Sequence, residues 1–184
     1  MLKLDPIWQP EVQQTNFRLL LDAMAYPGRR FALHAVPNKE HAALSVLATL
    51  LDAEVTLSDP LDLLSADDWL MLQSKSTSED RADYVLCDAS QLPKFSPKLG
   101  TLPDPEQSAT LILMVNKIGK GVSKFKLSGP GIKNSEDLIV EGLNSEWLSK
   151  RDDWVGSFPL GIDMILVDEQ YVTALPRTTK VEVV

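Results

Sequence analysis

Apolar residues recur along the chain with the spacing of helices in some segments and of strands in others. Four segments have apolar residues at helical spacing, which predicts helices with one buried face. They are a helix before Pro27-Gly28 with Phe17, Leu20, Leu21 and Met24, a helix with Leu44, Leu47, Ala48 and Leu51, a short helix with Ser65 and Asp68 as a capping box, and a helix from Ser145 to about Asp153. Pro27-Gly28 is typical of a helix end because proline cannot continue the hydrogen-bond pattern.

Other apolar runs have the length and composition of strands. They predict a buried strand at 82–87, a pair of strands at 110–115 and 122–127, and a final hairpin at 161–167 and 171–175. Helices and strands alternate irregularly, and short turns join neighbouring strands. The pattern therefore predicts the α/β class: one domain over residues 1–184, with a mixed, partly antiparallel sheet and helices on its faces.

Composition and charge exclude several classes of protein. The chain has 184 residues and a formal charge of −8, which argues against a nucleic-acid surface, because such surfaces need clustered Lys and Arg. No apolar run approaches the length of a membrane span. The first residues lack the apolar core of a secretory signal, and the single Cys87 cannot form an intrachain disulfide, so we expect a cytoplasmic protein.

The sequence contains few of the residues and motifs that are typical of catalytic sites. Two histidines and one cysteine without ligand spacing argue against a metal site. There is no Gly-x-Ser-x-Gly elbow and no glycine-rich nucleotide loop, although a triad assembled by the fold stays open. The segment from 88 to 108 contains five of the chain's prolines and glycines and no apolar periodicity. A loop of this length in a compact domain is usually functional, partner-binding or mobile.

Three charged residues lie at positions where a structural or a functional role is expected. Asp163 falls inside an apolar run, where a carboxylate needs a cation or several donors to stay ionised. Arg18 lies on the first predicted helix, and Arg177 follows a proline after the last strand. One interpretation is a structural ion pair or cap; the other is an interface or an anion site that uses Arg18 or Arg177. Gly129-Pro130-Gly131 is likewise either a plain turn or a set of amides that bind an anion.

Four stretches that contain glycine or proline at defined places carry a family resemblance. They are Gln14-Thr15-Asn16-Phe17-Arg18 continuing to Ala23-Met24-Ala25-Tyr26-Pro27-Gly28, then Leu127-Ser128-Gly129-Pro130-Gly131-Ile132, then Phe158-Pro159-Leu160-Gly161-Ile162-Asp163, and Ala174-Leu175-Pro176-Arg177-Thr178-Thr179. In this order they resemble PhnH, a subunit of the bacterial carbon-phosphorus lyase core complex. The resemblance covers essentially the whole chain. With Gln14, which the first motif contains, the candidate functional or interface residues are Gln14, Arg18, Asp163 and Arg177.

The resemblance implies an accessory subunit that is required for coupling a phosphonate to the ribose of ATP. It implies a fold similar to that of the pyridoxal-phosphate-dependent transferases, without that cofactor or any other. It also implies a homodimer in isolation and association with the G, I and J subunits of the complex. Candidate partner surfaces are the proline-rich loop and Trp8, Trp69, Trp147 and Trp154. The alternative is a stand-alone dimeric enzyme or binding protein for a phosphorylated small molecule.

Overall fold

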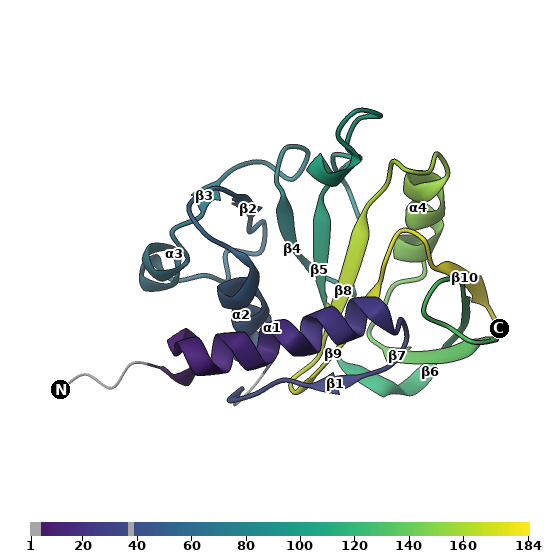
Figure 1. Cartoon of the computed structure of the whole chain (residues 1–184), viewed down its shortest axis with the longest axis horizontal. Coiled ribbons are helices and arrows are strands. Elements are labelled where there is room, and N and C mark those ends of the chain that lie inside the picture. Colours follow the sequence, from purple (N-terminus) through teal and green to yellow (C-terminus); the bar gives the residue numbers. More distant parts are fainter. Residues whose placement is uncertain (1–4, 37–38) are drawn as a thin grey trace.

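The computed structural model describes residues 5–36 and 39–184, and its strands form two sheets (Figure 1). The large sheet has seven strands in the order β1-β9-β8-β5-β4-β2-β3, and the small sheet has three in the order β10-β6-β7. The strands are β1 Phe31–Ala32, β2 Thr56–Ser58, β3 Lys75–Ser76, β4 Tyr84–Asp88, β5 Thr110–Met114, β6 Lys117–Ser128, β7 Glu136–Glu141, β8 Asp163–Val167, β9 Tyr171–Leu175 and β10 Lys180–Val183. The predicted α/β class with a mixed sheet is confirmed.

The large sheet is parallel at its centre and antiparallel at one edge. Strands β8, β5, β4, β2 and β3 run parallel, whereas β9 pairs antiparallel with β8 and with β1. The predicted final hairpin is β8 with β9. The predicted pairing of 110–115 with 122–127 is wrong, because β5 lies between β4 and β8, and β6 pairs with β7 and β10. The physical reason lies in the patterns: an all-apolar strand is covered on both faces, whereas Phe125 and Leu127 alternate with lysines on a strand with one wet face.

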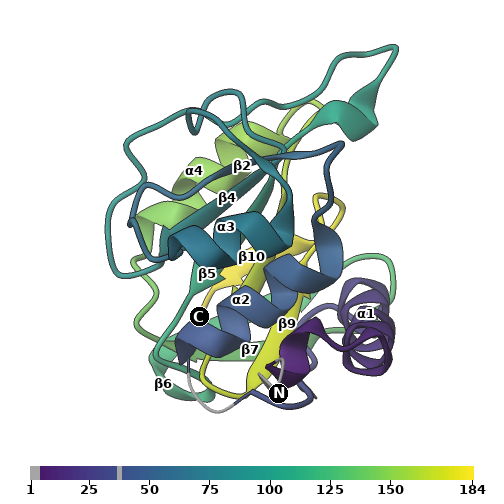
Figure 2. The same ribbon diagram turned by 90° about the vertical axis from the view of Figure 1, so that its left-hand side faces the viewer.

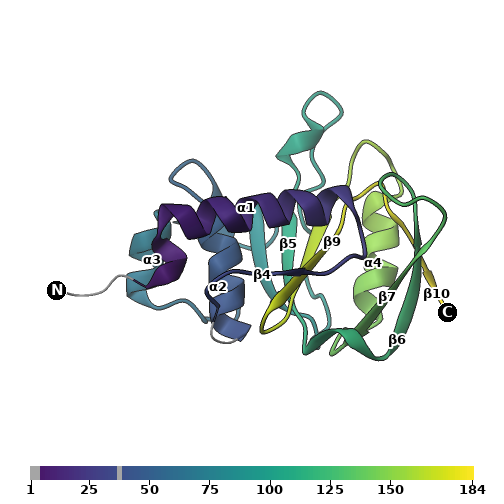
Figure 3. The ribbon, with the colours of Figure 1, turned by 60° about the horizontal axis from the view of Figure 1, so that its bottom comes forward.

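Helices cover both faces of the large sheet. They are α1 Pro10–Ala25, α2 Lys39–Leu50, α3 Ala66–Leu72 and α4 Glu146–Val155, with short 3-10 turns at Pro6–Trp8 and Pro105–Gln107. Helices α1, α2 and α3 pack on one face, and α4 packs on the other together with the small sheet (Figures 1, 2 and 3). Helix α3 begins with the predicted capping box, in which the Ser65 hydroxyl accepts from the Asp68 amide and the Asp68 carboxylate accepts from the Ser65 amide.

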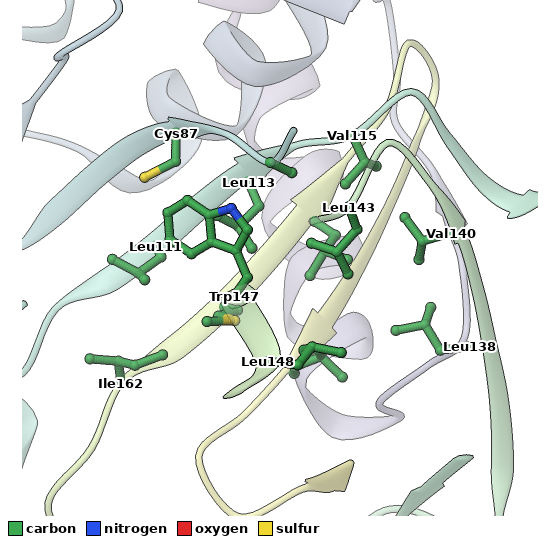
Figure 4. Packing of buried hydrophobic residues seen from close by; sticks show 14 of the residues in the cluster. Cys87, Leu111, Leu113, Val115, Leu138, Val140, Leu143, Trp147, Leu148 and Ile162 are labelled. Atoms are coloured by element: carbon green, nitrogen blue, oxygen red, sulfur yellow. The ribbon is translucent and has the colours of Figure 1, made fainter. Parts of the chain in front are cut away.

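Alternate residues of the central strands contribute to two separate hydrophobic clusters. In β5, Leu111 and Leu113 face α4 and the small sheet, whereas Ile112 and Met114 face α2. Figure 4 shows the cluster on the α4 side, with Trp147 packed among the strand residues. Trp147 and Trp154 are 2% and 7% exposed, so the expectation that they are partner surfaces is wrong. Their rings instead enclose Phe95 of the proline-rich loop and hold that loop against the core.

Asn16 of the first motif is buried on the inner face of α1. Its side-chain oxygen accepts from the His34 backbone amide at 2.8 Å, and its amide nitrogen donates to the Ser45 hydroxyl at 2.8 Å and to the His34 carbonyl at 3.3 Å. These bonds join α1 to α2 and to the segment after β1. Gln14 on the same helix is exposed.

We predict that Asn16→Ala lowers the free energy of unfolding by about 1 to 3 kcal/mol, because it leaves buried polar groups without partners. Gln14→Ala is the matched control on the same helix and should stay within about 0.5 kcal/mol of the parent. Urea unfolding followed by circular dichroism measures both. Equal stability of the two variants would contradict the assignment of Asn16 as the residue whose hydrogen bonds join α1 to α2.

Candidate functional site

The glycines of the motifs lie where separate parts of the chain come into backbone contact. Gly131 has φ +81°, and a β-carbon there would lie 2.0 Å from the Ala25 carbonyl oxygen at the end of α1. Gly129 has φ +128°, and its β-carbon would lie 2.9 Å from the Thr178 carbonyl oxygen. Only glycine permits both the conformation and the approach. The turn 129–131 therefore joins the end of α1 to the segment 176–179.

Asp163 and Arg177 form a largely buried ion pair between the start of β8 and the end of β9. The Arg177 Nη2 lies 2.7 Å from the Asp163 Oδ2, and the two side chains are only 16% and 17% exposed. Asp163 Oδ1 also accepts from the Arg177 backbone amide at 2.7 Å and from its Nε at 3.4 Å. The carboxylate thus receives the several donors that an ionised group needs at this depth.

The remaining donors of Arg177 hold two loops. Its Nη1 donates to the Pro105 carbonyl at 3.0 Å and to the Pro159 carbonyl at 3.2 Å, and its Nη2 donates to the Ser108 hydroxyl at 2.5 Å. A guanidinium has five N–H donors, and all five are used here. This arrangement supports the structural interpretation of Asp163 and Arg177. We call Asp163, Arg177, Pro105, Ser108 and Pro159 the arginine clamp.

Arg151 is a second buried arginine, and sequence reasoning did not single it out. It lies on α4, is 1% exposed, and donates through Nη2 to the carbonyls of Pro176 and Thr179 at 2.6 and 2.9 Å. Its Nε and Nη1 have no hydrogen-bond partner among the described residues. Burial lowers the pKa of Arg151 from its ordinary value. Arg151 lies at helical spacing from Trp147, Leu148 and Trp154, the other buried residues of α4, so its place on the apolar face of this helix was the sequence signal that could have found it.

The clamp holds two loops that carry exposed apolar side chains, at the end of the sheet where β5 and β8 begin. Leu102 and Phe158 are 73% and 70% exposed, and they lie in the two loops that Arg177 joins. A further bond from the Gly161 amide to the Leu99 carbonyl, at 3.0 Å, links these loops. Figure 1 shows both loops at the same end of the molecule. We call Leu102, Pro103, Phe158 and Pro159 the apolar tip.

Gln14 and Arg18 lie apart from the clamp, on the exposed face of α1. Neither has a side-chain hydrogen bond or an ion pair within the described residues. Phe17 and Leu21 on the same face are 45% and 54% exposed, so the predicted buried stripe that included them is wrong. Asn16, Leu20 and Ala23 are the buried residues of this helix instead. We call Gln14, Phe17, Arg18 and Leu21 the α1 stripe. The structure therefore brings Asp163, Arg177 and the turn 129–131 into one region and places Gln14 and Arg18 in another.

The part of the chain that the structure describes has neither a metal-ion cluster nor a membrane-spanning helix. Within 5–36 and 39–184 no group of three or more His, Cys, Asp or Glu side chains could hold a metal ion. No helix in the same ranges is long and apolar enough to cross a membrane. Cys87 is free and buried.

The comparisons with known proteins point to phosphonate metabolism. The family described as bacterial phosphonate metabolism protein (PhnH) matches residues 7–182. A C-P lyase subunit protein, HtxG of Stutzerimonas stutzeri, is 43% identical over 175 residues, which is 95% of this chain and 88% of that protein. The PhnH subunit of alpha-D-ribose 1-methylphosphonate 5-triphosphate synthase from Rhizobium meliloti is 33% identical over 192 residues, 97% and 92% of the two chains.

These matches place the chain in the class of phosphonate-metabolism proteins, and its two named relatives are subunits of larger enzymes. The chain belongs to the PhnH family, as the motifs indicated.

We predict that Arg177→Ala lowers the free energy of unfolding by about 3 to 5 kcal/mol, because it leaves the Asp163 carboxylate buried without its cation. Arg177→Lys should recover only part of this loss, since an ammonium has three donors and no planar fork. Arg81→Ala, an exposed arginine between β3 and β4, is the control and should stay within about 0.5 kcal/mol. Denaturant unfolding distinguishes these outcomes. Parent-like stability of Arg177→Ala would contradict the structural role of the clamp.

Proposed function

We propose that this chain is an accessory subunit of a carbon-phosphorus lyase complex, required for coupling a phosphonate to the ribose of ATP. In this proposal it assembles with the G, I and J subunits in the cytoplasm and contributes surface rather than the reacting groups. The family match and the two relatives that are named as subunits support it.

The observation that carries the proposal is the apolar tip. Large side chains that stay exposed are typical of surfaces that a partner covers. A mobile loop would lose conformational entropy on binding, whereas Arg177 already fixes both loops through the carbonyls of Pro105 and Pro159. The tip is therefore preorganised, and the partner it fits has an apolar groove.

We also propose that the isolated chain forms a homodimer through the α1 stripe. Phe17 and Leu21 supply apolar area, and Arg18 lies four residues before Asp22 on the same exposed face. In an antiparallel contact about a two-fold axis, each Arg18 would lie opposite the Asp22 of the other copy, so the surface is self-complementary. Gln14 lies at the end of the stripe, where a polar rim is expected.

The alternative, a stand-alone protein for a phosphorylated small molecule, requires a cavity with converging cations. The cavity beside Arg29 and Arg30 has a volume of about 550 Å³, but Glu136 and Asp137 also line it and offset the two arginines. Arg30 moreover donates to the Ile118 carbonyl at 3.3 Å. These observations favour the subunit over the stand-alone protein.

The relation of the fold to the pyridoxal-phosphate-dependent transferases, without the cofactor, stays a prediction. A Schiff base needs a lysine amine that can lose its proton. Lys98 and Lys117 instead pair with Asp83 and Glu169. The hydrogen bond that Lys117 donates to the Glu169 carboxylate raises the pKa of Lys117, which opposes such a role for that residue.

For the apolar tip, we predict that the double variant Leu102→Ser, Phe158→Ser folds within about 1 kcal/mol of the parent, because both side chains are exposed. It should lose co-purification with the G, I and J subunits and fail to support growth on a phosphonate as sole phosphorus source. Val122→Ser is the matched control, since Val122 is fully exposed on the small sheet. A double variant that still co-purifies would refute the tip as the partner surface.

For the homodimer, we predict that Leu21→Asp converts the isolated protein to a monomer, because it places a charge in the centre of the apolar contact. Size-exclusion chromatography with light scattering measures the mass, and the monomer mass is 20.4 kDa. Leu70→Asp is the control, since Leu70 is 75% exposed on α3, outside the stripe. A parent protein that is monomeric at micromolar concentration would overturn the proposed dimer, and a dimeric Leu21→Asp variant would place its interface elsewhere.

A further inference from the structure

The topology of the large sheet has a switch point between β2 and β4. These strands are parallel neighbours, but the chain leaves β2 toward β3 at one edge and leaves β4 toward β5 on the opposite side. The first connection contains α3, on the α2 face, and the second contains Phe95 and Leu99, which pack on the α4 face. In open α/β sheets, ligands bind outside the carboxyl ends of the strands at such a point.

A cavity of about 250 Å³ lies at this point. Its lining comes from the carboxyl ends of three adjacent parallel strands: Pro60 and Leu61 follow β2, Glu79 follows β3, and Cys87 and Asp88 end β4. A volume of this size accommodates a group of a few heavy atoms rather than a whole nucleotide.

The deep part of the cavity is apolar and fixed. Cys87 and Trp147 line it and are 4% and 2% exposed, and Phe95 contacts the Trp147 ring edge-on at a centroid distance of 6.2 Å. Figure 4 shows Cys87 and the Trp147 indole close together. The indole nitrogen donates to the Gln91 carbonyl at 2.8 Å, which ties this ring to the loop that forms the wall.

The outer part of the cavity carries net negative charge. Glu79 and Asp88 line it, and Lys94 is the lysine at its rim. Neither Glu79 nor Lys94 forms an ion pair within the part of the chain that the structure describes. The Asp88 Oδ1 accepts from the Ser90 amide and hydroxyl at 2.9 and 2.8 Å, which fixes the carboxylate. Burial, followed by the charges of Glu79 and Asp88, raises the pKa of the Cys87 thiol, so the negative charge also acts on the apolar part.

We propose that this cavity binds a small organic cation, an ammonium or guanidinium group on a short apolar stem. The stem lies against Leu61, Phe95 and Trp147, where an aromatic face also attracts a cation. The charged end lies between Glu79 and Asp88. The same charges disfavour a phosphate or phosphonate group, so this site is distinct from any site for the substrate of the proposed complex and does not depend on that proposal.

The test is a titration of the full-length protein, labelled with ¹⁵N, with n-butylguanidinium in the millimolar range. The chain has four tryptophans, and Trp147→Phe identifies the indole signal of Trp147. We expect that signal to shift saturably while those of Trp8 and Trp69 do not. Butanol and butanoate, with similar stems but no positive charge, should bind at least about tenfold more weakly, a difference of about 1.4 kcal/mol.

A matched pair of double variants tests the two carboxylates. Glu79→Gln with Asp88→Asn should weaken n-butylguanidinium binding about tenfold or more, which corresponds to about 1.4 kcal/mol. Glu182→Gln with Asp153→Asn removes the same net charge from exposed positions elsewhere and should bind as the parent does. The thermal midpoint of each variant is measured to establish folding. If the first pair unfolds, Glu79→Gln alone serves.

Three results would overturn the proposal. They are no shift of the Trp147 signal with n-butylguanidinium, equal or tighter binding of butanol or butanoate, and an equal loss of binding in both double variants.

Discussion

The contact between Asp163 and Arg177 is the constraint on which one end of this fold depends. Burying a guanidinium costs free energy unless its donors find partners. The partners of Arg177 are Asp163 at the start of β8 and the carbonyls of Pro105 and Pro159 in two loops. Because the arginine follows β9, the antiparallel edge of the sheet is joined to the segment before β5. Breaking this contact would release both loops at once.

The second buried arginine extends the same arrangement. Arg151 reaches from α4 to the carbonyls of Pro176 and Thr179, the residues on either side of the Arg177 and Thr178 pair. Gly129 approaches Thr178 from the small sheet, and Gly131 approaches the end of α1. The motif segments that are far apart in sequence are therefore neighbours in space. Gly129 and Gly131 are explained by close backbone contact, without any need for a ligand at the turn 129–131.

Local sequence patterns predicted the helices and strands better than they predicted which strands pair with one another. The presence of the helices, the capping box at Ser65 and the hairpin of β8 and β9 depend on residues that are close in sequence, and the sequence was sufficient for them. The buried face of α1 was predicted wrongly, because Phe17 and Leu21 are exposed. The partner of β5 was not predictable, because the choice between β6 and β8 depends on which faces the rest of the chain covers. Strands β7 and β10 lack a distinctive apolar run and were missed. Trp147 and Trp154 look alike as core or interface until the packing of Phe95 is known.

The candidate site residues also differ in how far the sequence could predict their environments. An ion pair of Asp163 with a nearby arginine was an open interpretation from sequence, and the structure favours it because Arg177 uses all of its donors within the chain. Arg18 has the opposite environment, with an exposed side chain beside Phe17 and Leu21. The cavity at the carboxyl ends of β2, β3 and β4 had no sequence signal, because Leu61, Glu79 and Asp88 converge only through strand order.

The apolar tip and the cavity lie at opposite ends of the parallel strands. The amino ends of β5 and β8 adjoin the rigid apolar tip, and the carboxyl ends of β2 and β4 form the acidic cavity. Since the two surfaces lie at opposite ends of the sheet, the proposed partner on the tip and the proposed small molecule in the cavity would not compete for the same atoms. The loop from 89 to 109 touches both, because Phe95 lines the cavity and Leu102 lies in the tip, and α4 with the loop after it does so too, through Trp147 and Phe158. Trp147 and Arg177 hold this loop in place at its two ends, through the carbonyls of Gln91 and Pro105.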